Sequence, residues 1–120
     1  MATILLADDD AAVRELVKRA LLAEGHTVHV TQDGNEALDV LNAHKTIIDV
    51  LISDVDMPGL DGVSLAMQAQ RAKPGIAVVL MSGFSDQLER ARELSQKRLK
   101  SITKPFTLDQ IKQAVRAVTG

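Results

Sequence analysis

Apolar residues along this chain follow two alternating patterns. Short runs of consecutive apolar residues that stop at polar or turn-forming residues indicate buried parallel strands. Between them, apolar residues recur every three or four positions, which is the spacing of an amphipathic helix. Strands are therefore expected over residues 3–7, 27–31, 50–53, 76–81 and 101–103. Helices are expected between Asp10 and Gly25, after Gly34, and over about 61–71, 86–97 and 108–118.

This alternation of strand and helix predicts an α/β fold. Parallel strands need crossover connections, and those crossovers are right-handed, so helices are expected on both faces of one parallel sheet. The chain contains no linker, repeat or low-complexity segment. Because 120 residues suffice for one domain with a substantial core, residues 1–120 are predicted to be a single domain.

Composition narrows the class of protein. Hydrophobic residues make up 46% of the chain and aromatic residues only 2%, so the core must be aliphatic. Cysteine is absent, and His26, His29 and His44 lack the spacing of a metal-binding motif. A net charge of −2 does not favour nucleic-acid binding. No apolar run approaches the ~18 residues of a membrane span, and no signal peptide opens the chain. A soluble cytoplasmic protein without nucleic-acid or membrane partners is expected.

Polar residues of particular kinds follow four of the predicted strands. Asp8 and Asp9 follow the first strand, Asp54 the third, Ser82 the fourth and Lys104 the fifth. The carboxyl ends of parallel strands form the ligand crevice of an open α/β sheet. If the first and third strands are neighbours, the three carboxylates converge at this edge.

Three adjacent carboxylates repel one another, which raises the pKa of at least one unless a cation intervenes. Mg²⁺ suits such a site because it takes one or two carboxylates, several waters and a phosphate oxygen. Lys104 adds a positive charge and Ser82 a hydroxyl donor. The set predicts a phosphoryl-transfer site with a carboxylate nucleophile. Asp10 and Asp61, taken singly, are better explained as turn formers or helix N-caps.

Four motifs extend this hypothesis to a family. They are Leu6-Ala7-Asp8-Asp9-Asp10, Ile52-Ser53-Asp54-Val55-Asp56-Met57-Pro58-Gly59-Leu60-Asp61-Gly62, Leu80-Met81-Ser82-Gly83-Phe84 and Thr103-Lys104-Pro105-Phe106. With these motifs, in this order and at these spacings, the chain resembles response-regulator receiver domains over essentially its whole length. The resemblance implies a flavodoxin-like, doubly wound five-stranded parallel sheet of order 2-1-3-4-5, with five helices on its two faces.

The resemblance also implies roles for the acidic residues. Asp54 would accept a phosphoryl group from the phosphohistidine of a sensor histidine kinase or phosphotransfer protein. Asp8 and Asp9 would hold Mg²⁺ together with Asp54, and the backbone carbonyl of Asp56 would complete the protein ligands.

The remaining site residues would act on the phosphorylated form. Ser82 would hydrogen bond a phosphoryl oxygen, and Lys104, joined to Pro105 by a cis peptide bond, would ion-pair with the acyl phosphate. The chain departs from the family pattern at Ser101, where many members carry an aromatic switch residue. Phe84 or Phe106 would have to replace it, since the chain has no other aromatic side chain.

Output is expected through a protein contact or a phosphorelay step. No output domain follows the last predicted helix, and the opening Met1-Ala2-Thr3 favours a natural start, so a stand-alone receiver is expected. However, Leu80 to Asp86 also resembles receivers fused to hybrid histidine kinases, and the chain could be a piece of one. The downstream partner is expected on the face of the fourth helix, fifth strand and fifth helix, at the exposed residues Leu88, Ala91, Arg92 and Lys112.

Two alternatives remain at this point. Asp54 and Asp56 match the nucleophile dyad of a haloacid-dehalogenase-like aspartyl phosphatase. That dyad normally lies on the first strand of a longer chain, whereas here Asp8 and Asp9 come first. A receiver-like scaffold that binds partners without phosphorylation would not need the complete set of site residues.

Overall fold

The computed structural model describes residues 1–43, 46–83 and 86–119, with the backbone alone for 86–88. No helix within these ranges is long and apolar enough to cross a membrane. The elements, in chain order, are β1 (Thr3–Ala7), α1 (Ala11–Ala23), β2 (Thr27–Thr31), α2 (Gly34–Ala43), β3 (Val50–Asp54), α3 (Gly62–Ala72), β4 (Ala77–Ser82), the 3₁₀ helix η1 (Asp86–Glu93), β5 (Leu99–Thr103) and α4 (Leu108–Thr119).

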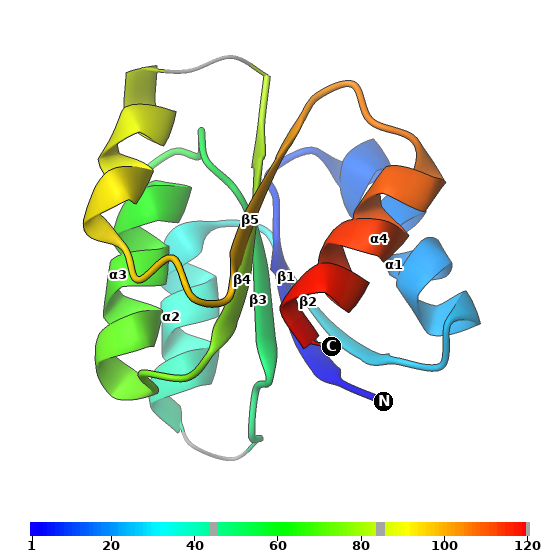
Figure 1. Ribbon diagram of the computed structural model, residues 1–120, viewed down its shortest axis with the longest axis horizontal. Coiled ribbons are helices and arrows are strands. Elements are labelled where there is room, and N and C mark those ends of the chain that lie inside the picture. The colour runs from blue at the N-terminus through cyan, green and yellow to red at the C-terminus, as the bar shows by residue number, and fades with distance from the viewer. Residues whose placement is uncertain (44–45, 84–85, 120) are drawn as a thin grey trace.

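The strands form one parallel sheet in the order β2-β1-β3-β4-β5, which confirms the flavodoxin-like fold. Helices α1 and α4 cover one face, while α2, α3 and η1 cover the other (Figure 1). The first and third strands are therefore neighbours, with Ile4 opposite Val50 and Ala7 opposite Ser53. This register brings the carboxyl ends of β1 and β3 together.

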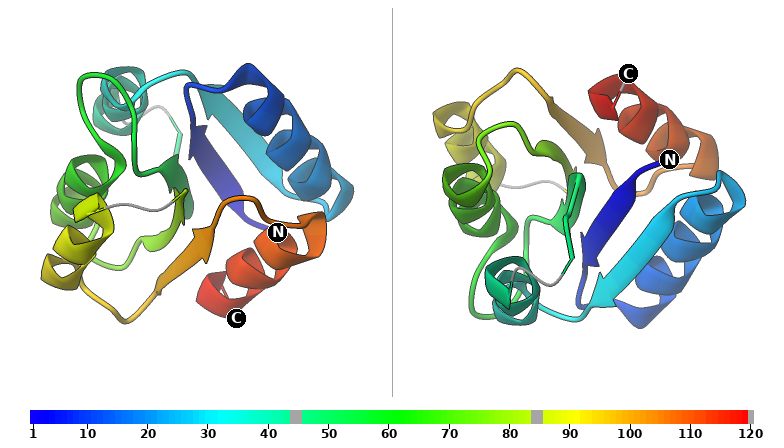
Figure 2. Two further views of the ribbon diagram at one scale, coloured as in Figure 1. Left: turned by 90° about the horizontal axis from the view of Figure 1, so that it is seen from above. Right: turned by 90° about the horizontal axis from the view of Figure 1, so that it is seen from below.

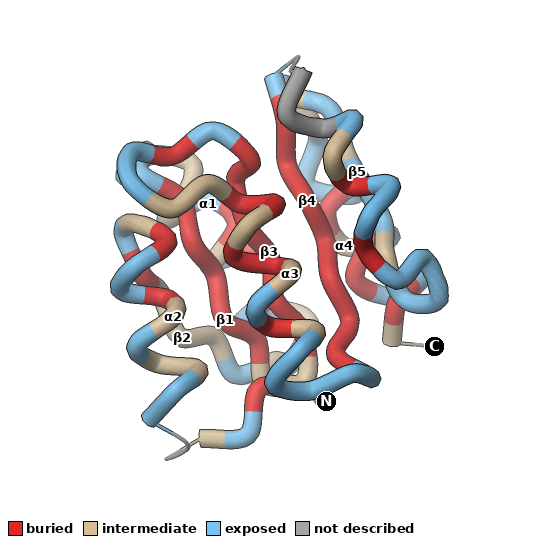
Figure 3. Tube along the Cα trace, turned by 90° about the vertical axis from the view of Figure 1, so that its left-hand side faces the viewer, coloured by how far each residue is buried: buried red, intermediate tan, exposed pale blue. Residues whose placement is uncertain are grey.

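Two aliphatic cores lie on the two faces of the sheet. Successive side chains of a strand point to opposite faces, so Leu5 and Leu51 pack toward α2 and α3, whereas Ile4 and Ile52 pack toward α1 and α4. The central strands β1, β3 and β4 are buried almost throughout (Figure 3). A core built from Leu, Ile, Val and Ala accords with the low aromatic content, and it fixes the strands that carry the site.

The helix predicted over 86–97 is present, but it is the 3₁₀ helix η1 and it ends at Glu93. The described ranges therefore contain four α-helices and one 3₁₀ helix. The segment is strongly polar, and Ala91 is the one buried residue among its described side chains. With few apolar side chains to pack against the rest of the protein, a regular α-helix gains little from tertiary contact. The side chain of Gln96 donates hydrogen bonds to the carbonyls of Ala91 and Leu94 and closes the end of this short helix.

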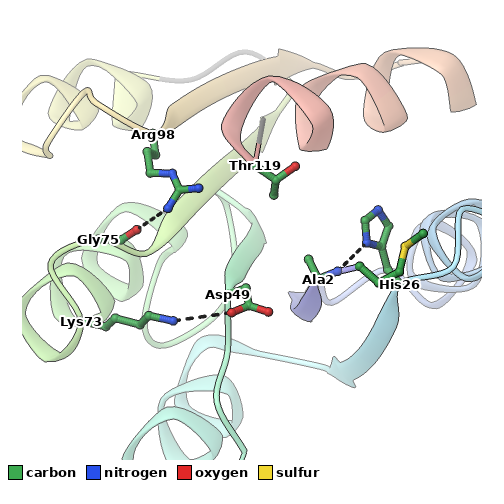
Figure 4. Close-up of a pocket in the computed structure, with 8 residues that line it drawn as sticks. Ala2, His26, Asp49, Lys73, Gly75, Arg98 and Thr119 are labelled. Carbon is green, nitrogen blue, oxygen red and sulfur yellow. Dashed lines mark hydrogen bonds and ion pairs between the residues drawn. The ribbon is translucent and has the colours of Figure 1, made fainter.

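The amino ends of the strands meet at the opposite end of the sheet. A hollow of about 410 Å³ lies there (Figure 4). Lys73 contacts the carboxylate of Asp49 at 3.8 Å, and Arg98 donates a hydrogen bond to the carbonyl of Gly75 at 3.2 Å. Asp49 in turn accepts the backbone N–H of Thr3 at 2.8 Å. These contacts tie the strand ends to their connections, so the side chains of this end are engaged in holding the fold.

Candidate functional site

The predicted site residues lie together at the carboxyl edge of the sheet. Asp8 follows β1, Asp54 ends β3, Ser82 ends β4 and Lys104 follows β5. The register places Asp54 opposite Met81 and Ser82 opposite Thr103, so the four strand ends are level with one another. The left-hand view of Figure 2 looks down on this edge.

The three acidic residues expected to converge do so. Asp8, Asp9 and Asp54 each offer a carboxylate oxygen, and these oxygens lie within 4.8 Å of one another. The side chains of Asp8 and Asp54 are buried, whereas Asp9 is exposed. A set of oxygen donors at this spacing, open to solvent on one side, fits a hard divalent cation such as Mg²⁺.

The environment of Asp54 disfavours its charged form. Burial, followed by the charge of Asp8, raises the pKa of Asp54 to about 6, although Lys104 and the backbone N–H of Asp56 both act to lower it. The N–H of Asp56 donates to Oδ1 of Asp54 at 3.3 Å. A carboxylate held charged in such surroundings at neutral pH is poised to gain from positive charge.

Lys104 supplies part of that charge. Its Nζ lies 3.1 Å from Oδ2 of Asp8 and 3.4 Å from Oδ2 of Asp54, so one cation bridges two carboxylates. Burial lowers the pKa of Lys104, but the two carboxylates outweigh burial and raise it, which keeps the ammonium charged. The cis peptide bond between Lys104 and Pro105 is confirmed.

Ser82 is buried, and its hydroxyl has no partner. Among the buried side chains in the described ranges, its Oγ is the one polar atom without a hydrogen bond. Such an unsatisfied hydroxyl is destabilising by about 1–3 kcal/mol. Its position at the end of β4, next to β3, leaves a hydroxyl donor available to a ligand bound at Asp54.

Two supports of the site escape sequence reasoning. A Cβ on Gly62 would lie 2.1 Å from the backbone oxygen of Asp54, so glycine is needed where α3 begins. Nη1 of Arg14, on α1, donates to the carbonyl of Asp8 at 2.8 Å and steadies the loop after β1. Gly62 lies inside a motif, but its contact is invisible without the packing of α3. Arg14 has no local signal beyond its helical position.

The two predicted N-caps are confirmed. Asp10 accepts hydrogen bonds from the N–H groups of Ala12 and Val13 at the start of α1. Asp61 accepts the N–H of Ser64 at the start of α3. Neither residue belongs to the group of carboxylates that could share a cation.

The structure tests only part of the predictions for Asp56 and for the aromatic residues. The side chain of Asp56 is exposed, and its carbonyl as a metal ligand stays a prediction. Ser101 is exposed on β5, while Phe106 is half-buried against the core on the α1 and α4 face. Phe84 lies outside the described residues, so a replacement for the aromatic switch stays untested.

The predicted exposed partner face is partly wrong. Ala91 is only 7% exposed and packs into the core on the α3 face, because η1 turns this side inward. Arg92 is exposed and Lys112 is half-buried. The side chain of Leu88 lies outside the described part of the chain.

Comparison with known proteins agrees with this geometry. The family model "Response regulator receiver domain" matches residues 4–116. The chain is 33% identical over 115 residues to the sensor kinase CckA of Brucella abortus, covering 96% of this chain and 12% of that protein. It is also 33% identical over 115 residues to the response regulator MprA of Mycolicibacterium vanbaalenii, covering 96% of this chain and 49% of that protein. The chain thus spans less than half the length of both curated relatives.

A solved structure agrees as well. The response regulator protein TrrA from Thermotoga maritima, solved in complex with Mg(2+)-BeF, superposes with a TM-score of 0.84 at 27% identity, covering 98% of this chain and 99% of that one. The haloacid-dehalogenase-like alternative finds no support in these comparisons. The chain belongs to the response regulator receiver domain family of two-component systems.

Proposed function

We propose that residues 1–120 act as one phosphoacceptor domain, which takes a phosphoryl group onto Asp54 from the phosphohistidine of a sensor histidine kinase or phosphotransfer protein. The observation that carries this proposal is the buried, unpartnered hydroxyl of Ser82 at the strand end beside Asp54. A folded protein tolerates a buried hydroxyl without a hydrogen-bond partner where that hydroxyl binds a ligand. A phosphoryl oxygen on Asp54 is an acceptor of the right kind.

The acidic cluster suits a metal-dependent reaction. Asp8, Asp9 and Asp54 would hold Mg²⁺, with the backbone carbonyl of Asp56 as a further ligand. When bound, the ion would supply positive charge that offsets the negative charge of the acceptor carboxylate and of the phosphoryl group. The oxygen-only donor set and the Mg(2+)-BeF complex of the related TrrA support this assignment.

The residues of the chain divide the remaining work. A carboxylate oxygen of Asp54 attacks phosphorus and forms the acyl phosphate, while the phosphorus–nitrogen bond of the phosphohistidine breaks and the imidazole leaves with the electron pair. Lys104, which already contacts Asp54, pairs with the new phosphoryl charge. Ser82 donates its hydroxyl proton in a hydrogen bond to a phosphoryl oxygen. Attack by water then returns the carboxylate and inorganic phosphate, which resets the domain.

Output would follow from a face that phosphorylation alters. The face formed by η1, β5 and α4 is the proposed docking surface for a downstream protein. A hollow of about 510 Å³ lies between β5 and α4 on this face. The partner would bind there according to the difference between its affinities for the phosphorylated and unphosphorylated forms.

Location of the protein in the cytoplasm stays a prediction.

An intact-mass experiment tests the acceptor. The protein is incubated with Mg²⁺ and a small acyl phosphate or phosphoramidate donor, alongside Asp54→Asn and a sample with EDTA. One phosphoryl adduct that needs Mg²⁺ and is lost in Asp54→Asn is expected. Turnover of a small phosphate ester by catalytic amounts of the protein would indicate a phosphatase instead. If no adduct forms and neither donor is consumed, the result contradicts the proposal.

A further inference from the structure

Side-chain hydrogen bonds fasten η1 to α3 at Arg90, and they fasten Ser95, which follows the end of η1, to α3 at Gln70. At the end near the site, Nη1 of Arg90 lies 3.1 Å from Oδ2 of Asp61, and Nη2 of Arg90 lies 2.9 Å from Oγ of Ser64. At the far end, the side-chain amide of Gln70 donates to the carbonyl of Ser95 at 3.1 Å and accepts its N–H at 2.9 Å. These two fastenings connect different parts of the molecule.

Polar contacts carry much of this attachment. In the part of η1 whose side chains are described, Ala91 is the one that is buried, and Leu94 follows directly after the helix. A 3₁₀ helix has poorer hydrogen-bond geometry than an α-helix. The position of η1 therefore depends on the hydrogen bonds that its side chains make with α3.

The fastening at Arg90 leads to the acceptor residue. Asp61 is the N-cap of α3 and accepts the N–H and the hydroxyl of Ser64 at 2.9 and 2.8 Å. The next residue, Gly62, donates its N–H to the carbonyl of Val55 at 2.9 Å and lies against the backbone of Asp54. These contacts join the backbone at 54–55 directly to the start of α3.

The ion pair itself has the properties of an adjustable contact. Burial acts to raise the pKa of Asp61, but hydrogen bonds from Ser64 and Arg90 outweigh it and lower that pKa, so the carboxylate stays charged at neutral pH. Both side chains are partly exposed, at 40% for Arg90 and 24% for Asp61. Partly exposed ion pairs are weak enough to be broken and remade in a switch.

We propose that Arg90 is a positioning residue that couples phosphorylation of Asp54 to η1, through Asp61 and the start of α3. This inference rests on the proposed function and specifies its output route. This coupling through Arg90 would take the place of the aromatic switch residue, whose position is occupied here by Ser101, exposed on β5. The fastening at Gln70 holds η1 but does not touch the acceptor loop.

Amide hydrogen exchange of residues 86–96 tests the coupling. The full chain is compared with and without Mg²⁺ and beryllofluoride, a phosphoryl mimic, and binding of the mimic is measured on the same samples. In the wild type, exchange of this segment should change by roughly fivefold, the lower range of coupling between sites. In Arg90→Ala, beryllofluoride should still bind within about twofold of the wild-type affinity, while the change in exchange is lost.

Three further variants separate coupling from simple attachment. Gln70→Ala removes the other fastening and should keep the change on binding. Asp61→Asn retains an N-cap for α3 but removes the ion pair, and it should lose the change as Arg90→Ala does. Arg90→Lys keeps the charge with fewer hydrogen bonds and should restore part of it.

The outcomes distinguish this inference from the proposed function. A full change in Arg90→Ala, or an equal loss in Gln70→Ala, would overturn the coupling role. Beryllofluoride binding with no change in the wild-type segment would also overturn it while leaving the acceptor intact. Absence of both beryllofluoride binding and a phosphoryl adduct in the wild type would overturn the proposed function and this inference with it.

Discussion

Replacement of Asp54 by asparagine should make the unphosphorylated protein more stable at neutral pH. Asp54 is 6% exposed, lies beside Asp8 and has its pKa raised from 3.8 to about 6. The folded state therefore binds a proton at Asp54 more tightly than the unfolded state does. Asparagine has nearly the same shape, still accepts hydrogen bonds through its carbonyl oxygen, and carries no charge.

The magnitude follows from the difference between the two pKa values. At about 1.4 kcal/mol for each pKa unit, a rise from 3.8 to about 6 corresponds to about 3 kcal/mol. This penalty applies in full above pH 6, where Asp54 is ionised in both states, and it decreases as the pH falls toward 4. The raised pKa already includes the favourable contact with Lys104, so we expect Asp54→Asn to be more stable than the wild type by about 3 kcal/mol at pH 7.5.

Urea unfolding at pH 7.5 and pH 4.0, with EDTA present, measures this difference. The chain has no Trp or Tyr, so far-UV circular dichroism is the suitable signal. The midpoint of Asp54→Asn should exceed that of the wild type at pH 7.5, and the two should approach each other at pH 4.0. Equal midpoints at pH 7.5, or a difference that does not shrink on acidification, would refute the reasoning from burial and charge.

Further expectations concern the other groups around the acceptor. Ser82→Ala removes an unpartnered hydroxyl, so the free energy of unfolding should be unchanged or raised by up to about 1 kcal/mol, while adduct formation followed by mass should slow by roughly tenfold or more. Lys104→Ala leaves the Asp8 carboxylate buried without its cation and should lower stability by about 3 kcal/mol in urea titrations; uptake should persist, but partner switching should be lost in a pull-down with the phosphorylated form. Gly62→Ala should destabilise by about 3 kcal/mol or more because its Cβ would meet the backbone of the acceptor, whereas Gly75→Ala, with open space around it, should stay within about 0.5 kcal/mol. Mg²⁺ should raise the melting temperature of the wild type in a concentration-dependent manner. The Gly75→Ala control keeps the acidic cluster and should show the same increase, so a smaller increase in this control would count against a specific site.

Much of the fold and the site follows from local sequence. Runs of apolar residues define the strands because a parallel strand is buried on both faces. Four of the five runs end at a residue of the site, so the convergence of Asp8, Asp9 and Asp54 needs only the strand order in addition. That order came from the resemblance, since apolar runs do not say which strands are neighbours.

The parts that could not be predicted depend on packing between distant residues. The burial of Ala91 was missed because a polar segment with few apolar residues does not define which side faces the core. Arg90 meets Asp61 across 29 positions. Such contacts are set by how helices dock on the sheet, which periodicity does not encode.

The polar attachment of η1 bears on how such a domain diversifies. Substitutions on the exposed side of η1, at Glu89, Arg92 and Glu93, leave the aliphatic core and the phosphorylation chemistry untouched. Descendants of one receiver can therefore acquire new binding preferences by changing this segment, with little loss of foldability. Among close relatives of this chain, divergence should concentrate in these outward positions, while the pair formed by Arg90 and Asp61 should vary together.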